Sequence, residues 1–117
     1  MICEICWKTQ VIENIVYETE HWVLILGPAK AQIIGYFYLA PKRHVENWQE
    51  FTEKELGEIG FLTQKAECIL KETIKIERLY SVIISEELRH IHIHLIPREE
   101  TENLKGLKLI EKALAKK

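Results

Sequence analysis

The sequence has no excess of basic residues, no long apolar run and no low-complexity segment. Its 117 residues include 16 basic and 18 acidic side chains, for a formal net charge of -2. Proteins that coat nucleic acid need a basic surface, so this balance argues against nucleic acid as a partner. No apolar stretch reaches the roughly 20 residues of a membrane-spanning helix. A membrane protein is therefore not expected.

The start of the chain lacks the basic segment and apolar stretch of a secretory signal peptide, so we expect a cytoplasmic protein. Cysteine is scarce, and two of the three cysteines form the pair Cys3-x-x-Cys6. In a reducing compartment this spacing indicates metal or redox chemistry rather than a structural disulfide. Hydrophobic residues make up 47% of the chain, enough for a core without disulfides. The length suits one domain, residues 1–117.

Hydrophobic patterns predict an alternation of strands and helices. A capping box from Thr52 to Glu55 predicts the start of a helix, which apolar residues at helical spacing extend over 53–75. A second helical stripe predicts a C-terminal helix over about 103–116.

Runs of β-branched and aromatic residues predict strands over 12–19, 21–26, 33–40, 79–85 and 90–96. Proline follows the third and the last of these runs and is expected to end them. The order predicts an α+β fold: an antiparallel β-sheet with one long helix packed on it and a C-terminal helix.

The most distinctive feature is three histidines at alternate positions, His90, His92 and His94. Side chains of a strand alternate between its two faces, so these imidazoles are expected to share one face. A row of imidazoles on a rigid strand can ligate a metal, bind phosphate or attack phosphorus. Two alternatives are a polar face exposed to solvent and a structural metal site made by all three histidines.

Cys3, Cys6, His44 and one histidine of this row form a Cys2His2 set. Two thiolates and two neutral imidazoles suit a closed tetrahedral site for structural Zn²⁺, so residues 1–10 are expected to bind metal. The metal would tie the N-terminal segment to the histidine strand and contribute to the free energy of folding. A redox dithiol or two free cysteines are the alternatives, although the βαβ context of a thioredoxin-like dithiol is missing.

The segment His-Ile-His-Ile-His-Leu-Ile at 90–96 resembles the signature of the histidine-triad (HIT) superfamily, three histidines separated by apolar residues and followed by two more. Residues 35–45 resemble its segment G-[HY]-x-x-x-x-P-K-x-H, and the Cys-x-x-Cys pair resembles its zinc-bearing members. The resemblance covers about residues 1–98. It implies an antiparallel sheet with a long helix, paired as a homodimer.

The resemblance also implies roles for the histidines. His92, the middle one, would attack the α-phosphorus of a nucleotide and form a covalent nucleotidyl-histidine intermediate. His94 would donate hydrogen bonds to the phosphate oxygens. The implied metal ligands are Cys3, Cys6, His44 and His90. The expected function is a nucleotide hydrolase or nucleotidyltransferase that acts on a nucleoside phosphate ester, anhydride or phosphoramidate.

Two positions depart from the family pattern. Residues 86–88, Glu-Glu-Leu, stand where the family has a small polar stretch, and two carboxylates beside a phosphate are unfavourable unless paired. Arg89 is expected to offset them in the substrate site. Gly27 stands where many members have an aspartate that binds the ribose, and this chain contains no aspartate, so Gly27 would lie at a sugar that is held differently. The alternative is a catalytically degenerate, zinc-stabilised module that binds a nucleotide or phosphate.

Overall fold

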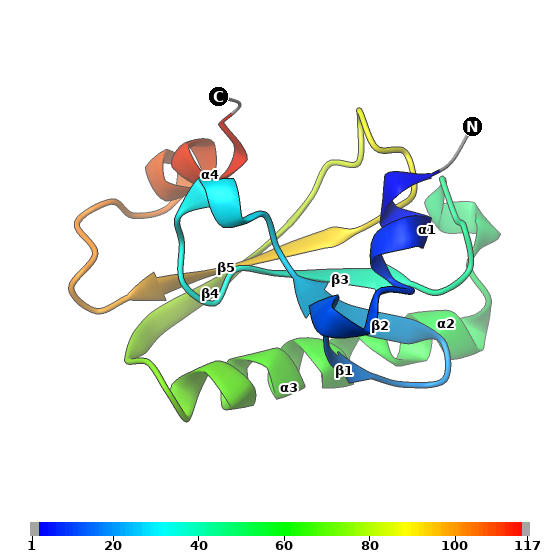
Figure 1. Ribbon diagram of the computed structural model, residues 1–117, viewed down its shortest axis with the longest axis horizontal. Coiled ribbons are helices and arrows are strands. Elements are labelled where there is room, and N and C mark those ends of the chain that lie inside the picture. The colour runs from blue at the N-terminus through cyan, green and yellow to red at the C-terminus, as the bar shows by residue number, and fades with distance from the viewer. Residues whose placement is uncertain (1–2, 116–117) are drawn as a thin grey trace.

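The β-branched and aromatic runs form a five-stranded sheet in the computed structural model, which describes residues 3–115 (Figure 1). Neighbouring strands are antiparallel, in the order β1-β2-β3-β5-β4. The strands are β1 Ile15–Glu18, β2 Trp22–Leu26, β3 Phe37–Pro41, β4 Ile76–Ile83 and β5 Ile93–Glu99. The helices are α1 Glu4–Lys8, α2 Glu53–Gly57, α3 Ile59–Lys71 and α4 Leu107–Leu114, with short 3₁₀ turns η1 Ile12–Asn14, η2 Ala29–Ala31 and η3 Trp48–Glu50. The predicted α+β fold class is confirmed.

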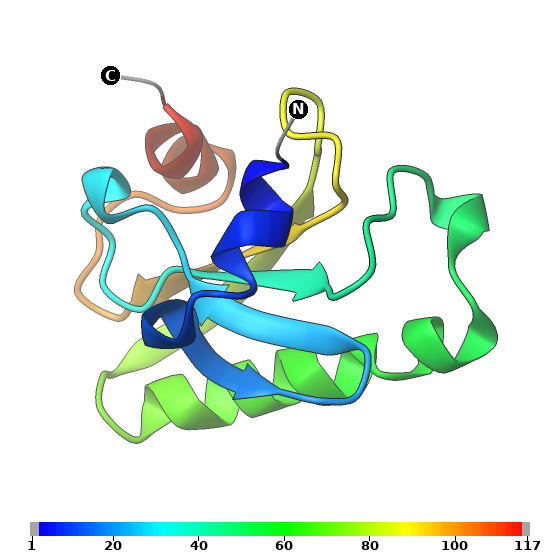
Figure 2. The same ribbon diagram turned by 45° about the vertical axis from the view of Figure 1, so that its right-hand side comes forward.

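The sheet lies between two layers of helices. Helix α3 runs along one face, and α1 and α4 cover the other (Figures 1 and 2). The pleat of β2 shows why both faces are apolar: Trp22 and Leu24 pack with Leu62 of α3, whereas Val23 and Ile25 belong to the opposite cluster. Each fully buried side chain of this size contributes about 1.5–3 kcal/mol. Because helices cover both faces of the sheet, polar side chains on those faces are shielded from solvent.

The single helix predicted over 53–75 is wrong in two respects. It is split into α2 and α3 at Glu58, which ends the first and begins the second, and it ends at Lys71. Gly57 and Gly60 flank the break, and glycine is a poor helix former. The Glu58 carboxylate also accepts hydrogen bonds from the turn between β1 and β2. The break therefore ties α3 to the edge of the sheet.

Of the two prolines that were expected to end strands, Pro41 does so and Pro97 lies inside one. Pro41 is the last residue of β3 and pairs with Trp22, and Pro97 pairs with Leu79 inside β5. Both prolines lie beyond the residues that pair β3 with β5. A backbone N–H at these positions would have no partner strand on that side, so the missing N–H of proline costs no ladder hydrogen bond. Proline is therefore tolerated at both positions.

The ends of the chain carry two shorter elements. The C-terminal helix predicted over about 103–116 is observed as the shorter α4, which begins only at Leu107, after Gly106 with its positive φ of 60°; residue 116 lies outside the described residues. Residues 1 and 2 of the predicted metal-binding segment also lie outside them. Within residues 3–115, none of the helices combines the length and apolar character needed to cross a bilayer.

Candidate active site and metal centre

A short N-terminal helix brings the two cysteines together. Cys3 caps α1, and its Sγ accepts a hydrogen bond from the backbone N–H of Cys6 at 3.4 Å. Between them, Ile5 is fully buried and anchors the helix on the sheet. Because the cysteines are three residues apart in a helix, both thiols lie on one side of α1.

Two histidines from distant segments meet these thiols. Nδ1 of His90 lies 3.5 Å from the Sγ of Cys3 and 3.3 Å from that of Cys6, and Nδ1 of His44 lies 3.4 Å from the Sγ of Cys6. All four donor atoms lie within 4.8 Å of one another. Zinc bonds of about 2.0–2.3 Å in a tetrahedron place ligand atoms about 3.5 Å apart. The four residues could therefore hold a zinc ion.

The ring nitrogens that point away from the thiols, Nε2 of His90 and Nε2 of His44, have partners that suit a metal site. Nε2–H of His90 donates to the carbonyl oxygen of Pro41 at 2.9 Å, which leaves Nδ1 as the unprotonated nitrogen of the neutral ring. Nε2 of His44 lies 2.9 Å from a carboxylate oxygen of Glu46. Metal-bound histidines usually donate their second N–H to a carbonyl or carboxylate in this way. Both rings thus turn Nδ1 toward the thiols.

The thiols themselves need a cation to ionise together. Burial and the neighbouring Cys3 raise the pKa of the Cys6 thiol to about 11. Two adjacent thiolates repel each other, and a dication removes that penalty and deprotonates both. The chemistry of the donor set therefore fits zinc.

The three histidines share the side of the sheet that α1 covers, but only His94 lies within a strand. Strand β5 begins only at Ile93, so His90 and His92 precede it. Their backbone is bonded outside the sheet: Ile91 N–H donates to the carbonyl of Val45 at 2.7 Å. His90 faces the two thiols, whereas His92 and His94 line a cavity.

His92 lines that cavity, and its hydrogen bonds determine which ring nitrogen is free. Its Nδ1–H donates to the carbonyl oxygen of His90 at 2.8 Å, and its backbone N–H donates to Oγ of Ser85 at 3.1 Å. A carbonyl can only accept, so the neutral ring carries its proton on Nδ1 and an unshared pair on Nε2. Burial lowers the pKa of His92, which is only 4% exposed, and the Lys8 charge lowers it further. The ring is therefore neutral near pH 7, with an unshared electron pair on Nε2.

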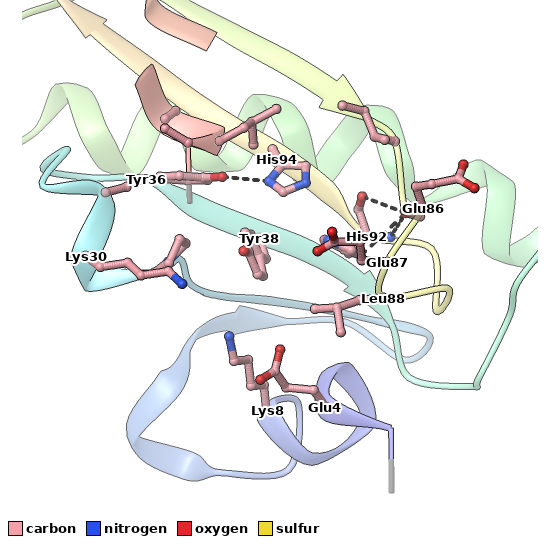
Figure 3. A pocket seen from close by; sticks show the side chains of 17 residues that line it. Glu4, Lys8, Lys30, Tyr36, Tyr38, Glu86, Glu87, Leu88, His92 and His94 are labelled. Atoms are coloured by element: carbon pink, nitrogen blue, oxygen red, sulfur yellow. Dashed lines mark hydrogen bonds between the residues drawn. The ribbon is translucent and has the colours of Figure 1, made fainter. Parts of the chain in front are cut away.

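His94 stands beside it in a different hydrogen-bond setting. The two ring centroids are 4.8 Å apart, and Nδ1 of His94 lies 2.6 Å from the hydroxyl of Tyr36 (Figure 3). Burial, and then the neighbouring His92, lower the pKa of His94 to about 4. Burial also raises the pKa of the Tyr36 hydroxyl well above its usual value. Both groups are uncharged at neutral pH.

The cavity has a volume of about 540 Å³ and charged groups on two sides. Lys8 and Lys30 lie on one side of the Tyr38 ring, and Glu86 and Glu87 lie on the side of His92 (Figure 3). The ring of Tyr38 forms part of the wall between them, with its centroid 5.0 Å from those of both cavity histidines. The site thus joins a nucleophilic nitrogen to groups of both signs.

Two predicted substrate residues are not part of the cavity wall. Arg89 is exposed, and its guanidinium lies 3.5 Å from the carboxylate of Glu86, which does line the cavity. Gly27 donates its N–H to the carbonyl of Tyr36, and a Cβ at this position would lie 2.7 Å from that oxygen. Gly27 therefore permits the close approach that places Tyr36 beside His94.

Several cavity residues were not found from the sequence. Tyr36 and Tyr38 alternate along the chain, and Tyr38 pairs with His94 across the β3–β5 ladder, so alternation on a strand was a usable signal. No sequence pattern marks Ser85, Lys8 or the end of α4, since they reach the cavity only through tertiary packing.

The comparisons with known proteins agree with this arrangement. The model of the HIT domain family matches residues 8–101. An uncharacterized HIT-like protein of Methanocaldococcus jannaschii is 28% identical over 95 residues, which cover 78% of this chain and 73% of that protein.

Solved structures show the same fold at low sequence identity. A HIT family protein of Bacillus anthracis has a TM-score of 0.72 and 21% identity, and the match covers 91% of this chain and 83% of that one. A Zn-bound histidine triad family protein of Mycobacterium smegmatis has a TM-score of 0.66 and 19% identity, covering 86% and 78%. At these identities the likeness supports the fold alone.

Proposed function

This chain belongs to the HIT domain family, and we propose that it is a nucleotide hydrolase or nucleotidyltransferase in which Nε2 of His92 attacks the phosphorus of a bound nucleotide. One observation carries the proposal. The carbonyl of His90 holds the Nδ1 proton of His92, so the free electron pair of Nε2 belongs to a residue that lines the cavity. A neutral imidazole of lowered pKa is nucleophilic without prior loss of a proton.

The chemistry proceeds in two displacements. In the first, the Nε2 electron pair forms an N–P bond, and the leaving group departs with the electrons of its bond to phosphorus and takes a proton from solvent. The imidazole ring then carries a positive charge, which the His90 carbonyl stabilises through Nδ1–H. In the second, water or another acceptor attacks phosphorus and releases a proton, and the N–P electrons return to Nε2.

His94 assists by donating a hydrogen bond to the phosphoryl oxygens. The Tyr36 hydroxyl, which burial keeps protonated, donates to Nδ1 of His94 and leaves the ring proton on Nε2. A donor fixed beside the reacting phosphorus stabilises the charge that develops on its oxygens. His92 and His94 thus act as nucleophile and hydrogen-bond donor although both rings are neutral.

Zinc has a structural role in this proposal. Cys3, Cys6, His44 and His90 would hold it, and the ion would supply only the electrostatic link that fastens α1 to the segment before β5. That segment carries the carbonyl that orients His92. The ligand set is therefore expected to support the nucleophile without contacting substrate.

The proposed partners are a nucleotide or a nucleotide-like small molecule and a second copy of the chain. Family membership supports the homodimer, and so does the edge strand β4, which pairs with a neighbouring strand on one side only among the described residues. An unpaired edge of this length is a template for pairing with another strand. Light scattering after size exclusion measures the state, and a monomer at micromolar concentration contradicts it.

A binding module without turnover is the second candidate function. Glu86 and Glu87 line the cavity near His92, and negative charge beside a phosphoryl group opposes binding and attack. Such a module would still bind a nucleotide through its neutral imidazoles. Turnover and adduct formation separate the two functions.

The test is intact-protein mass spectrometry after brief incubation with an adenosine phosphoramidate. We expect a nucleotidyl adduct that maps to His92 and is absent from the variant His92→Asn. The control His21→Asn removes a histidine that pairs with Glu58 away from the cavity and should keep the adduct. Binding of the nucleotide with no adduct and no turnover would support the binding module instead.

A further inference from the structure

Ser85 lies where the chain leaves β4, and its backbone conformation is unusual. The last pair of the β4–β5 ladder is Ile83 with Ile93. Two residues after Ile83, Ser85 has a φ of 50°, in the left-handed region that residues other than glycine and asparagine seldom adopt. A conformation of this kind is strained and persists only where the surrounding contacts hold it. The contacts of Ser85 therefore indicate what the strain supports.

The side chain of Ser85 contacts both backbone groups of His92. Its Oγ accepts a hydrogen bond from the His92 N–H at 3.1 Å and lies 3.5 Å from the His92 carbonyl oxygen, to which it can donate. In an antiparallel ladder, the backbone of a partner residue supplies such a pair of bonds. One step beyond the last ladder pair, Ile84 would stand opposite His92, but β4 has already ended. The Ser85 hydroxyl thus takes the place of a missing strand partner.

The same hydroxyl also lies close to the ring of His92. Its Oγ is 3.4 Å from Nδ1, the nitrogen whose proton goes to the His90 carbonyl at 2.8 Å. His92 precedes β5, so the ladder does not fix its position. Both the backbone and the ring of His92 are therefore held by groups outside the sheet, and Ser85 supplies the side-chain part of that support.

We propose that Ser85 is a positioning residue for the nucleophile: its hydroxyl substitutes for a strand partner and fixes the backbone of His92, so that Nε2 stays where it can attack phosphorus. The inference rests on the proposed function, because a reacting group must be held more precisely than a binding group. Ser85 acts through His92 and need not touch the substrate. Strained residues are common where a functional group is held in one arrangement, which agrees with the positive φ at this position.

Three substitutions separate the hydroxyl of Ser85 from the stability of its loop. Ser85→Gly and Ser85→Ala both remove the hydroxyl, but glycine adopts a positive φ without strain, so Ser85→Gly should melt at a higher temperature than Ser85→Ala. Ser85→Thr keeps the hydroxyl but places a β-branched residue at a positive φ, so it should melt below wild type.

Activity should follow the hydroxyl and not the melting temperature. With an adenosine phosphoramidate, we expect kcat to fall about ten- to hundredfold in both Ser85→Gly and Ser85→Ala, with a smaller change in KM. Ser85→Thr should recover most of the lost kcat although it is less stable. A residue that only stabilised the loop would instead give a kcat that rises and falls with the melting temperature.

Amide hydrogen exchange adds a measurement that needs no substrate. The His92 N–H should exchange faster in Ser85→Gly than in wild type, because it loses its acceptor. Gln32→Gly is the matched control, since Gln32 also has a positive φ, of 56°, and lies outside the cavity wall. It relieves the same kind of strain and should change neither kcat nor the exchange of the His92 amide.

The positioning role is refuted if Ser85→Gly and Ser85→Ala keep the wild-type kcat, if kcat follows the melting temperature, or if the exchange of the His92 amide does not change. Failure of the proposed function gives a different result. Wild type then shows neither an adduct on His92 nor turnover, which removes the role of Ser85 in the attack, while faster exchange in Ser85→Gly still reports the contact between the two residues.

Discussion

Two single atoms decide what the cavity histidines offer to a ligand. The carbonyl oxygen of His90 lies 2.8 Å from Nδ1 of His92 and makes Nε2 an acceptor. The hydroxyl of Tyr36 lies 2.6 Å from Nδ1 of His94 and, in the proposed mechanism, donates to it, which leaves the ring proton on the opposite nitrogen. Burial keeps both rings neutral. In the proposed mechanism, residues of the same type therefore take opposite roles because of one backbone and one side-chain neighbour.

Tyr36→Phe tests this assignment. The change removes the hydroxyl but keeps the ring, so the His94 ring is no longer held in one tautomer. We expect kcat for an adenosine phosphoramidate to fall about tenfold with a smaller change in KM, since one hydrogen bond near a charged centre is worth about 1.5 kcal/mol. Nitrogen NMR of the labelled imidazoles should show a shift of the His94 tautomer.

Tyr80→Phe is the control for that experiment. Its hydroxyl accepts a hydrogen bond from the backbone N–H of Gly106 and does not line the cavity. It should leave kcat unchanged. An unaltered kcat and an unaltered tautomer in Tyr36→Phe contradict the role of the hydroxyl.

The ion pair of Glu55 and Arg43 stabilises the loop between β3 and α2. Hydrogen bonds from Arg43 lower the pKa of the Glu55 carboxyl from 4.5 to about 2. A lowered pKa in the folded state contributes stability above pH 4.5 that is lost as the pH falls toward 2. We expect Glu55→Gln to reduce the free energy of unfolding in urea by about 2 kcal/mol at pH 7 and by less at pH 3.

Glu53→Gln provides the comparison for Glu55→Gln, because Glu53 lies exposed in the same first turn of α2. Its effect should be small at both pH values. Equal losses for Glu55→Gln at pH 7 and pH 3 would show that the ion pair does not contribute through its charge.

At the scale of elements, α1 connects the metal cluster to the cavity. Its cysteines face His44 and His90, and Glu4 and Lys8, one turn apart, line the cavity on the other side. Helix α1 has only five residues, and isolated helices of that length are unstable in water. The buried Ile5 anchors the helix, and a metal bound by the candidate ligands would fasten it further, so metal loss should disturb the cavity wall.

Removal of the metal is a direct test of this connection. We expect about one zinc per chain by elemental analysis, and a lower melting temperature with increased amide hydrogen exchange in α1 after treatment with a strong chelator. Cys6→Ser should behave like the chelated protein. The control Cys68→Ser changes an exposed cysteine outside the cluster and should keep the metal. A protein purified without zinc that melts at the same temperature with and without added zinc contradicts the structural role.

At the scale of the whole molecule, the two faces of the sheet have different tasks. The face under α3 is an apolar layer that includes Trp22, Leu24 and Leu95. The opposite face carries the histidines, the tyrosines and α1, together with the end of α4. The apolar layer under α3 supplies stability, so the opposite face can hold buried imidazoles and a cavity.

The family, the fold class and the kinds of chemical group were accessible from the sequence, because they depend on short patterns. Hydrophobic alternation predicted the antiparallel sheet, and the spacing of the histidines and cysteines indicated the candidate metal ligands and the candidate nucleophile. The split of the long helix at Glu58 was not predictable, since it depends on bonds to the distant turn between β1 and β2. The predicted roles of the site residues stay predictions that the experiments above address.

Tertiary structure decided how those groups are used. Three alternating histidines look equivalent in sequence, yet His90 faces two thiols and the other two face a cavity. Which ring nitrogen is free depends on the carbonyls of Pro41 and His90 and on the Tyr36 hydroxyl. A hydrogen bond between residues far apart in the chain leaves no local pattern, so proton positions, the cavity and its two lysines follow only from the folded arrangement.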